Sequence, residues 1–173
     1  MKFCLKFVLC YLLLVTCYLL FPQSVSAQGE FTSSQDVFYT VSETGKTNVS
    51  HEVTLTNLTT NYYVSQYSIR LGFVDVTNVK ALDSKGNLKA DVTSEKNGTN
   101  IELSFDDQIV GKGNVRSFTV VYETGEIASK DGRIWEIIIP RIKDEPYLGA
   151  YTATLIVPRS LGKPSYVKPA EAA

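Results

Sequence analysis

The chain has 173 residues, 44% of them hydrophobic, with 17 basic and 18 acidic side chains and a formal net charge of −1. A nearly neutral chain without runs of like charge argues against nucleic acid or an anionic membrane surface as a partner. The length suits one ordinary domain with a single hydrophobic core.

Residues 1–27 have the pattern of a secretory signal peptide. Lys2 and Lys6 form a basic start, an apolar run follows at 7–21, and small residues precede Ala27. The run is shorter than the roughly 20 residues that a membrane-spanning helix needs. We expect a helical leader that is cleaved after Ala27, with an uncleaved membrane anchor as the alternative. Export would place the mature chain outside the cell, in the periplasm or at the cell surface.

All three cysteines, Cys4, Cys10 and Cys17, lie in this leader. Cys17 could be considered as a lipidation site, but the apolar run continues past it. We therefore interpret the three as apolar residues of a segment that is removed. A mature domain of this size folds without disulfides, so we expect neither a disulfide nor a cysteine nucleophile.

Apolar residues recur at every second position from Gln35 to Pro158, which predicts β-strands rather than helices. The first two expected strands form a hairpin around a turn at 44–46, a third follows, and a fourth covers 74–82. In the first three strands the residues expected to face the core are Val37, Tyr39, Val41, Val49, Val53, Leu55, Tyr67, Ile69 and Leu71.

Five further strands are expected after a turn at 83–87. Between the fifth and the sixth, Asn97-Gly98 is typical of a type I′ hairpin, in which both central residues have positive φ. The eighth, at 133–139, is apolar on both faces, and the ninth covers 151–157. The core-facing residues expected in the fifth, sixth and seventh strands are Leu88, Ala90, Val92, Ile101, Leu103, Phe105, Phe118, Val120 and Tyr122.

About nine short strands separated by turns indicate an all-β fold, an Ig-like or Greek-key β-sandwich in residues 28–158. A parallel sheet would need helices between its strands. Residues 159–173 contain Gly162, Pro164 and Pro169 and show no periodic pattern, so they are expected to be a linker that stops short of a further domain.

The mature chain shows no pattern typical of an active site. Its one histidine, His51, alternates with apolar residues, which favours a core histidine with a satisfied hydrogen bond over a catalytic base or a zinc ligand. Asp106 and Asp107 adjoin a glycine-containing loop, but a Ca²⁺ site needs 6 to 8 oxygen ligands, and a solvated turn is the simpler interpretation. We expect no catalytic residue, cofactor or metal.

Two places are candidates for binding. If one face of the eighth strand packs in the core, Ile134 and Ile138 on the other face need cover from an adjacent domain or a protein partner. The alternative is that this strand is simply central in a thick sandwich. Tyr62 and Tyr63, expected to point to opposite faces of a strand, could stack on a glycan, whereas Tyr67 shares the core face.

Residues 31–142 resemble the N-terminal region of exported bacterial transglutaminase-like proteins, and residues 162–166 resemble the segment that follows it. The segments that carry this resemblance are 31–37 (Phe-Thr-Ser-Ser-Gln-Asp-Val), 51–58 (His-Glu-Val-Thr-Leu-Thr-Asn-Leu), 132–136 (Gly-Arg-Ile-Trp-Glu), Pro140 and 162–166 (Gly-Lys-Pro-Ser-Tyr). A weaker resemblance is to the lumenal sandwich of ribophorin I, an oligosaccharyltransferase subunit.

In the transglutaminase-like proteins the sandwich precedes a papain-like domain with a Cys/His/Asp triad. This chain stops before such a domain and keeps no mature cysteine, so no catalytic residue is carried over. The resemblance implies a non-catalytic scaffold or docking module of a cell-envelope protein. A carbohydrate-binding module of the cell surface is the alternative.

Overall fold

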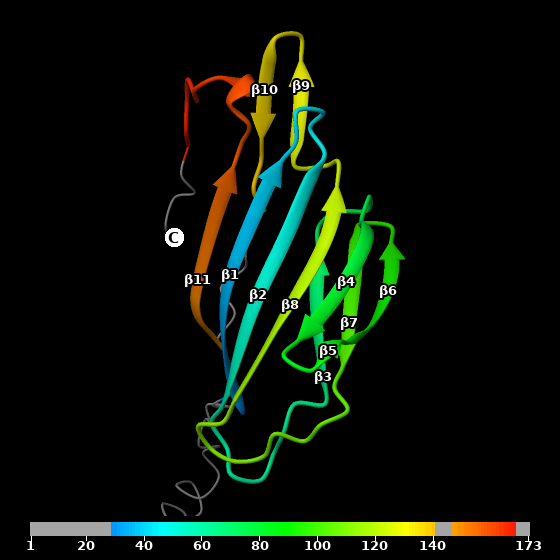
Figure 1. The fold of residues 1–173 in the computed structure, drawn as a ribbon, viewed down its shortest axis with the longest axis vertical. Helices are drawn as coiled ribbons and strands as arrows, with labels where there is room; N and C mark the ends of the chain where they lie inside the picture. The colour runs from blue at the N-terminus through cyan, green and yellow to red at the C-terminus, as the bar shows by residue number, and fades with distance from the viewer. Residues whose placement is uncertain (1–28, 141–146, 169–173) are drawn as a thin grey trace, which may run out of the picture.

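Two β-sheets pack face to face in the computed structural model, which describes residues 29–140 and 147–168 (Figure 1). The predicted leader lies outside the described residues. The strands are β1 (Phe31–Val41), β2 (Thr47–Asn57), β3 (Gln66–Leu71), β4 (Thr77–Asp83), β5 (Gly86–Asn87), β6 (Lys89–Glu95), β7 (Gly98–Ser104), β8 (Val115–Thr124), β9 (Ala128–Asp131), β10 (Ile134–Ile137) and β11 (Leu148–Ile156).

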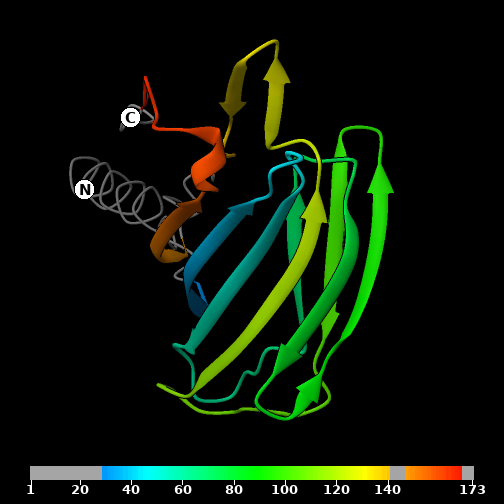
Figure 2. The same cartoon turned by 45° about the horizontal axis from the view of Figure 1, so that its top comes forward.

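The larger sheet has six strands in the order β11-β1-β2-β8-β4-β5, and the smaller has the order β3-β7-β6. Neighbouring strands are antiparallel, except that β11 runs parallel to β1. The smaller sheet faces the β2-β8-β4 side of the larger one, and a third unit, the β9–β10 hairpin, stands beyond the strand ends (Figures 1 and 2). The predicted all-β sandwich is therefore confirmed.

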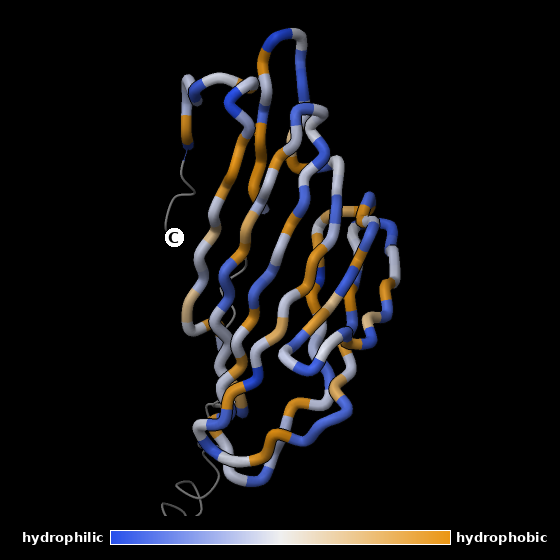
Figure 3. Tube along the Cα trace, viewed as in Figure 1, coloured by the Kyte–Doolittle hydropathy of each residue, from blue (hydrophilic) through white to orange (hydrophobic). Residues whose placement is uncertain are grey.

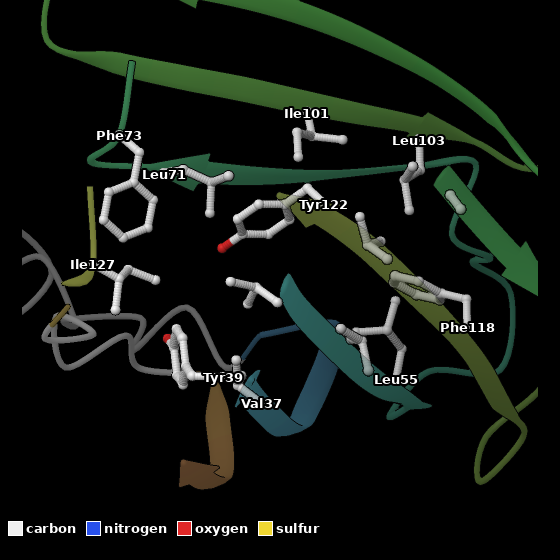
Figure 4. Packing of buried hydrophobic residues seen from close by; sticks show 14 of the residues in the cluster. Val37, Tyr39, Leu55, Leu71, Phe73, Ile101, Leu103, Phe118, Tyr122 and Ile127 are labelled. Atoms are coloured by element: carbon white, nitrogen blue, oxygen red, sulfur yellow. The ribbon is translucent and has the colours of Figure 1, made fainter. Parts of the chain in front are cut away.

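The core lies between the two sheets and is built by the alternation seen in the sequence. Tyr122 on β8 sits between the sheets, with Ile101 and Leu103 of β7 on one side (Figure 4). Tyr67 and Ile69 are half-buried against this core. Burying one such large apolar side chain stabilises a fold by about 1.5–3 kcal/mol. The predicted core residues found buried are Val37, Tyr39, Val41, Val49, Val53, Leu55, Leu71, Ile101, Leu103, Phe105, Phe118, Val120 and Tyr122. Leu88 and Ala90 are half-buried against this core, but the prediction is wrong for Val92, which is 43% exposed on the edge strand β6.

Among the strand boundaries that differ from the prediction, two have identifiable reasons. Strand β1 begins at Phe31, because its polar first half pairs through the backbone with both β2 and β11. Strand β4 begins at Thr77 rather than at Val74. The backbone N–H groups of Val74 and Asp75 both donate to Oε1 of Glu126, at 2.7 and 2.5 Å. Because these two groups bond to a side chain, they do not pair with a neighbouring strand.

The β6–β7 turn is a hairpin as predicted, but it is not of type I′. Glu95 pairs with Gly98, so the central residues are Lys96 and Asn97, and neither has positive φ. The glycine is needed for a different reason. A Cβ on Gly98 would lie 2.2 Å from the carbonyl oxygen of Leu71, which leaves no room for any side chain. Type I turns favour glycine at this fourth position.

Candidate docking surface

The eighth predicted strand is one arm of a hairpin of its own. Strand β10 pairs with β9 from Ile134↔Asp131 to Ile137↔Ala128, and these two strands form a separate two-stranded sheet. Gly132, with φ 58°, is the first central residue of the turn, as in type II′ hairpins. The strand expected at 133–139 is therefore shorter than predicted, and the alternative that it is central in a thick sandwich is wrong. Strand β9 was not predicted because its sequence is mostly polar, although the pair Asp131-Gly132 is typical of a hairpin turn.

The residues of β10 and those just after it alternate between two environments. Trp135, Ile137 and Ile139 are half-buried toward the molecule. Ile134 and Ile138 face the other way, with 72% and 61% of their surface exposed. In Figure 3 the arm that contains β10 and the segment after it includes hydrophobic positions, whereas the turn and β9 beside it are mostly hydrophilic. The separation of the two faces agrees with the sequence alternation, and no second sheet layer among the described residues covers the outward face.

The inward face fixes the hairpin to the sandwich. The ring of Trp135 lies over the β1–β2 turn, where a Cβ on Gly45 would come within 2.8 Å of Cζ3. The ammonium of Lys130 stands 5.4 Å from the centre of the same ring. The backbone N–H of Ile138 donates to the carbonyl of Ile127 at 2.9 Å, and Ile127 is buried beside Tyr39 and Phe73 (Figure 4). Ile134 and Ile138 thus belong to a hairpin arm whose inward face is packed against the sandwich.

The surroundings of Ile134 and Ile138 are polar and of mixed sign. Glu136 lies between them on the outward face, Asp131 of β9 pairs with Ile134, and Arg133 occupies the turn. An apolar centre with a charged border is the usual anatomy of a protein interface. Lys130 belongs to the opposite face, where it stands over Trp135, so this border holds the two acids Glu136 and Asp131 and the one base Arg133.

Tyr62 and Tyr63 lie in the segment between β2 and β3, outside any strand, so the expectation that they point to opposite faces of a strand is wrong. Both are exposed. Asn57 fixes this segment: its Nδ2 donates to the carbonyl of Tyr62 at 2.6 Å, and its Oδ1 accepts two hydrogen bonds from Thr59. The segment leaves the end of β2 that lies opposite the β9–β10 hairpin (Figure 1), so the two candidate sites are separate.

His51 is a core residue, as predicted. It is 6% exposed, its Nε2 lies 3.2 Å from the hydroxyl of Tyr122, and its Nδ1 has no hydrogen-bond partner among the described residues. Burial lowers the pKa of His51 to about 4. Burial also raises the pKa of Tyr122 and of Tyr39, whose hydroxyl lies 3.5 Å from that of Tyr151. These groups form a neutral polar cluster inside the core.

Asp106 is exposed, as a solvated turn predicts, but Asp107 takes part in a shared ion pair. Its carboxylate accepts hydrogen bonds from Lys85 at 2.8 Å and from Arg116, and these two cations lower its pKa to about 2. Arg116 is almost fully buried and lies 4.2 Å from the ring centre of Phe105. Among the described residues no three His, Cys, Asp or Glu side chains come together to hold a metal ion.

Within residues 29–140 and 147–168 no helix is long and apolar enough to cross a membrane. A comparison with protein-family models finds no match, and neither does a comparison with curated proteins. The resemblance to transglutaminase-like proteins and to ribophorin I therefore stays a prediction.

Proposed function

We propose that this chain is an exported, non-catalytic β-sandwich that docks an adjacent domain or a protein partner of the cell envelope through the outward face of β10. The observation that carries the proposal is the exposure of Ile134 and Ile138, at 72% and 61%, on a strand whose other face is anchored. Covering an isoleucine side chain stabilises a complex by up to about 1.5–3 kcal/mol, so two such residues are a substantial anchor.

The rigidity of the hairpin supports a role in binding. Association loses part of its free energy when flexible side chains and loops must be ordered. Here the register with β9, the packing of Trp135 on Gly45 and the hydrogen bond from Ile138 to Ile127 hold the backbone before any partner arrives. The outward isoleucines can therefore meet a partner with little further ordering of the backbone.

Three observations support a non-catalytic role. His51 is buried and neutral, and its described contacts include no carboxylate that could orient it as a base. Asp107 is engaged by Lys85 and Arg116. The cysteines all belong to the predicted leader. A Cys/His/Asp triad would need a histidine and a cysteine, but His51 is buried without a described carboxylate partner and the cysteines belong to the predicted leader.

The double variant Ile134→Ser, Ile138→Ser tests the proposal through folding stability. We expect its free energy of unfolding, measured by urea denaturation, to stay within about 1 kcal/mol of the wild type, since these side chains contact mainly water. Ile127→Ser is the matched control. The same chemical change at a buried position should cost about 3–5 kcal/mol. Unfolding of the double variant would show that the face belongs to the core and would reject docking.

Carbohydrate binding is a second candidate, favoured by the exposure of Tyr62 and Tyr63 on a segment that Asn57 fixes. Exposed aromatic rings on a fixed loop can stack on the apolar face of a sugar. A glycan array probed with the wild-type chain and with Tyr62→Ala, Tyr63→Ala tests it. We expect any glycan signal to disappear in the double variant, and silence of the wild type would remove this function.

A further inference from the structure

Strand β11 forms one edge of the six-stranded sheet. From Ser34↔Ala150 to Thr40↔Ile156 it pairs with β1 in a regular parallel register, after an irregularity at its start. No backbone hydrogen bond between the described residues joins the outer edge of β11 to another segment. Such an edge presents a row of N–H and C=O groups, about 20 Å long here, that fits another extended strand.

The other sheet edges carry features that discourage pairing with a foreign strand. Strand β6 has Lys89, Asp91 and Glu95, and β3 has Arg70. The β4 side is closed by β5 and interrupted by an irregular register, in which Asn78 has φ 54°. Charges, short strands and bulges are the usual means of protecting an edge. Strand β11, Leu-Gly-Ala-Tyr-Thr-Ala-Thr-Leu-Ile, has no charged residue and no proline.

We propose that β11 pairs antiparallel with β11 of a second copy of this chain, so that two six-stranded sheets continue into one across a twofold axis. A twofold axis brings a strand against its own sequence, and any charge near the axis would face a like charge. A strand without charges avoids that repulsion. The exposed side chains of Leu155 and Ile156, which lie on opposite faces of β11, would be covered on both sides of the joined sheet.

The regular part of β11 determines where the axis is expected. Its seven paired residues run from Ala150 to Ile156, so a symmetric overlap is centred at Ala153. This centring places Thr152 of one copy opposite Thr154 of the other. Both threonines lie on the outer face of the sheet, away from the core, so that their replacement tests pairing rather than packing.

The experiment measures the molar mass of the processed chain by sedimentation over a dilution series. We expect a dimer that dissociates on dilution. Thr152→Lys, Thr154→Lys and Thr152→Glu, Thr154→Glu should each be monomeric, because like charges then face one another. An equal mixture of the two variants should form a dimer again. The matched control is Thr54→Lys, Thr56→Lys, on the outer face of β2 two strands away from the edge, which should remain dimeric.

Several outcomes would overturn the proposal. If the wild-type chain is monomeric at every concentration, β11 does not pair with a second copy. A dimer that survives both β11 variants, or that the β2 control disrupts, has its interface elsewhere. Failure of the Lys and Glu variants to associate when mixed, with both shown to be folded by circular dichroism, would exclude β11 against β11. The result is independent of the β9–β10 hairpin, because Ile134 and Ile138 lie outside this edge.

Discussion

Lowering the pH from 6.5 toward 4 should destabilise this protein mainly through one residue, His51. Its ring is 6% exposed, its Nε2 contacts the Tyr122 hydroxyl at 3.2 Å, and its Nδ1 has no described partner. Protonation would place a positive charge and a second N–H in the core without an acceptor, which is costly when no carboxylate lies nearby. The folded protein therefore resists the proton that an unfolded chain accepts readily.

The size of the effect follows from the pKa of His51, which burial lowers from 6.5 to about 4. Between these two values the unfolded state binds more protons than the folded state, so stability rises with pH. The contribution is complete above pH 6.5 and is lost progressively as the pH falls toward 4. Each pH unit in this window corresponds to about 1.4 kcal/mol, which gives a total loss of about 3 kcal/mol.

Urea denaturation of the wild type and of His51→Gln, at a series of pH values across this window, measures the loss directly. We expect the wild type to lose about 3 kcal/mol more than the variant on acidification, because glutamine does not titrate. Asp107 contributes to the loss of stability only below about pH 4, since its pKa is lowered from 3.8 to about 2. Parallel pH profiles for the two proteins would show that His51 is not a buried neutral group and would refute the reasoning.

Two further predictions concern stability at neutral pH and use matched substitutions. Gly98→Ala places a Cβ 2.2 Å from a backbone carbonyl of β3 and should cost several kcal/mol in urea denaturation, whereas Gly72→Ala, with no atom within 4 Å, should change stability by less than about 1 kcal/mol. Equal effects would contradict the close approach. Arg116→Met should cost about 2–3 kcal/mol, because it removes a buried partner of Asp107, while Lys85→Met removes an exposed partner and should cost under about 1 kcal/mol. A larger loss of stability for Lys85→Met than for Arg116→Met would contradict the assignment of Arg116 as the main partner of Asp107.

The core faces of the longer strands could be predicted because period-two alternation determines which side chains point inward. Val49, Val53 and Leu55 on β2 are buried as expected. The same rule separated Ile134 and Ile138 from the inward face of β10. It failed for Tyr62 and Tyr63, because parity has no meaning in a segment that is not a strand.

Strand neighbours and long-range contacts could not be derived from local pattern. The parallel pairing of β11 with β1 joins residues more than a hundred positions apart, and nothing in either segment specifies the other. The start of β1 is polar and takes its structure from its neighbours. The loss of Val74 and Asp75 from β4 depends on the distant carboxylate of Glu126. Contacts of this kind are decided by the tertiary fold.

The most direct test of docking is site-specific photo-crosslinking in cells that produce the protein. A photoreactive amino acid replaces Ile134, and the control replaces Val92, which is also exposed but lies on the edge strand of the smaller sheet. The docking proposal predicts a discrete adduct at position 134, either with a partner protein or with an adjacent domain, that is absent at position 92 and lost with Ile138→Ser. An Ile134 probe that gives no adduct, or the same adducts as the Val92 probe, would contradict it.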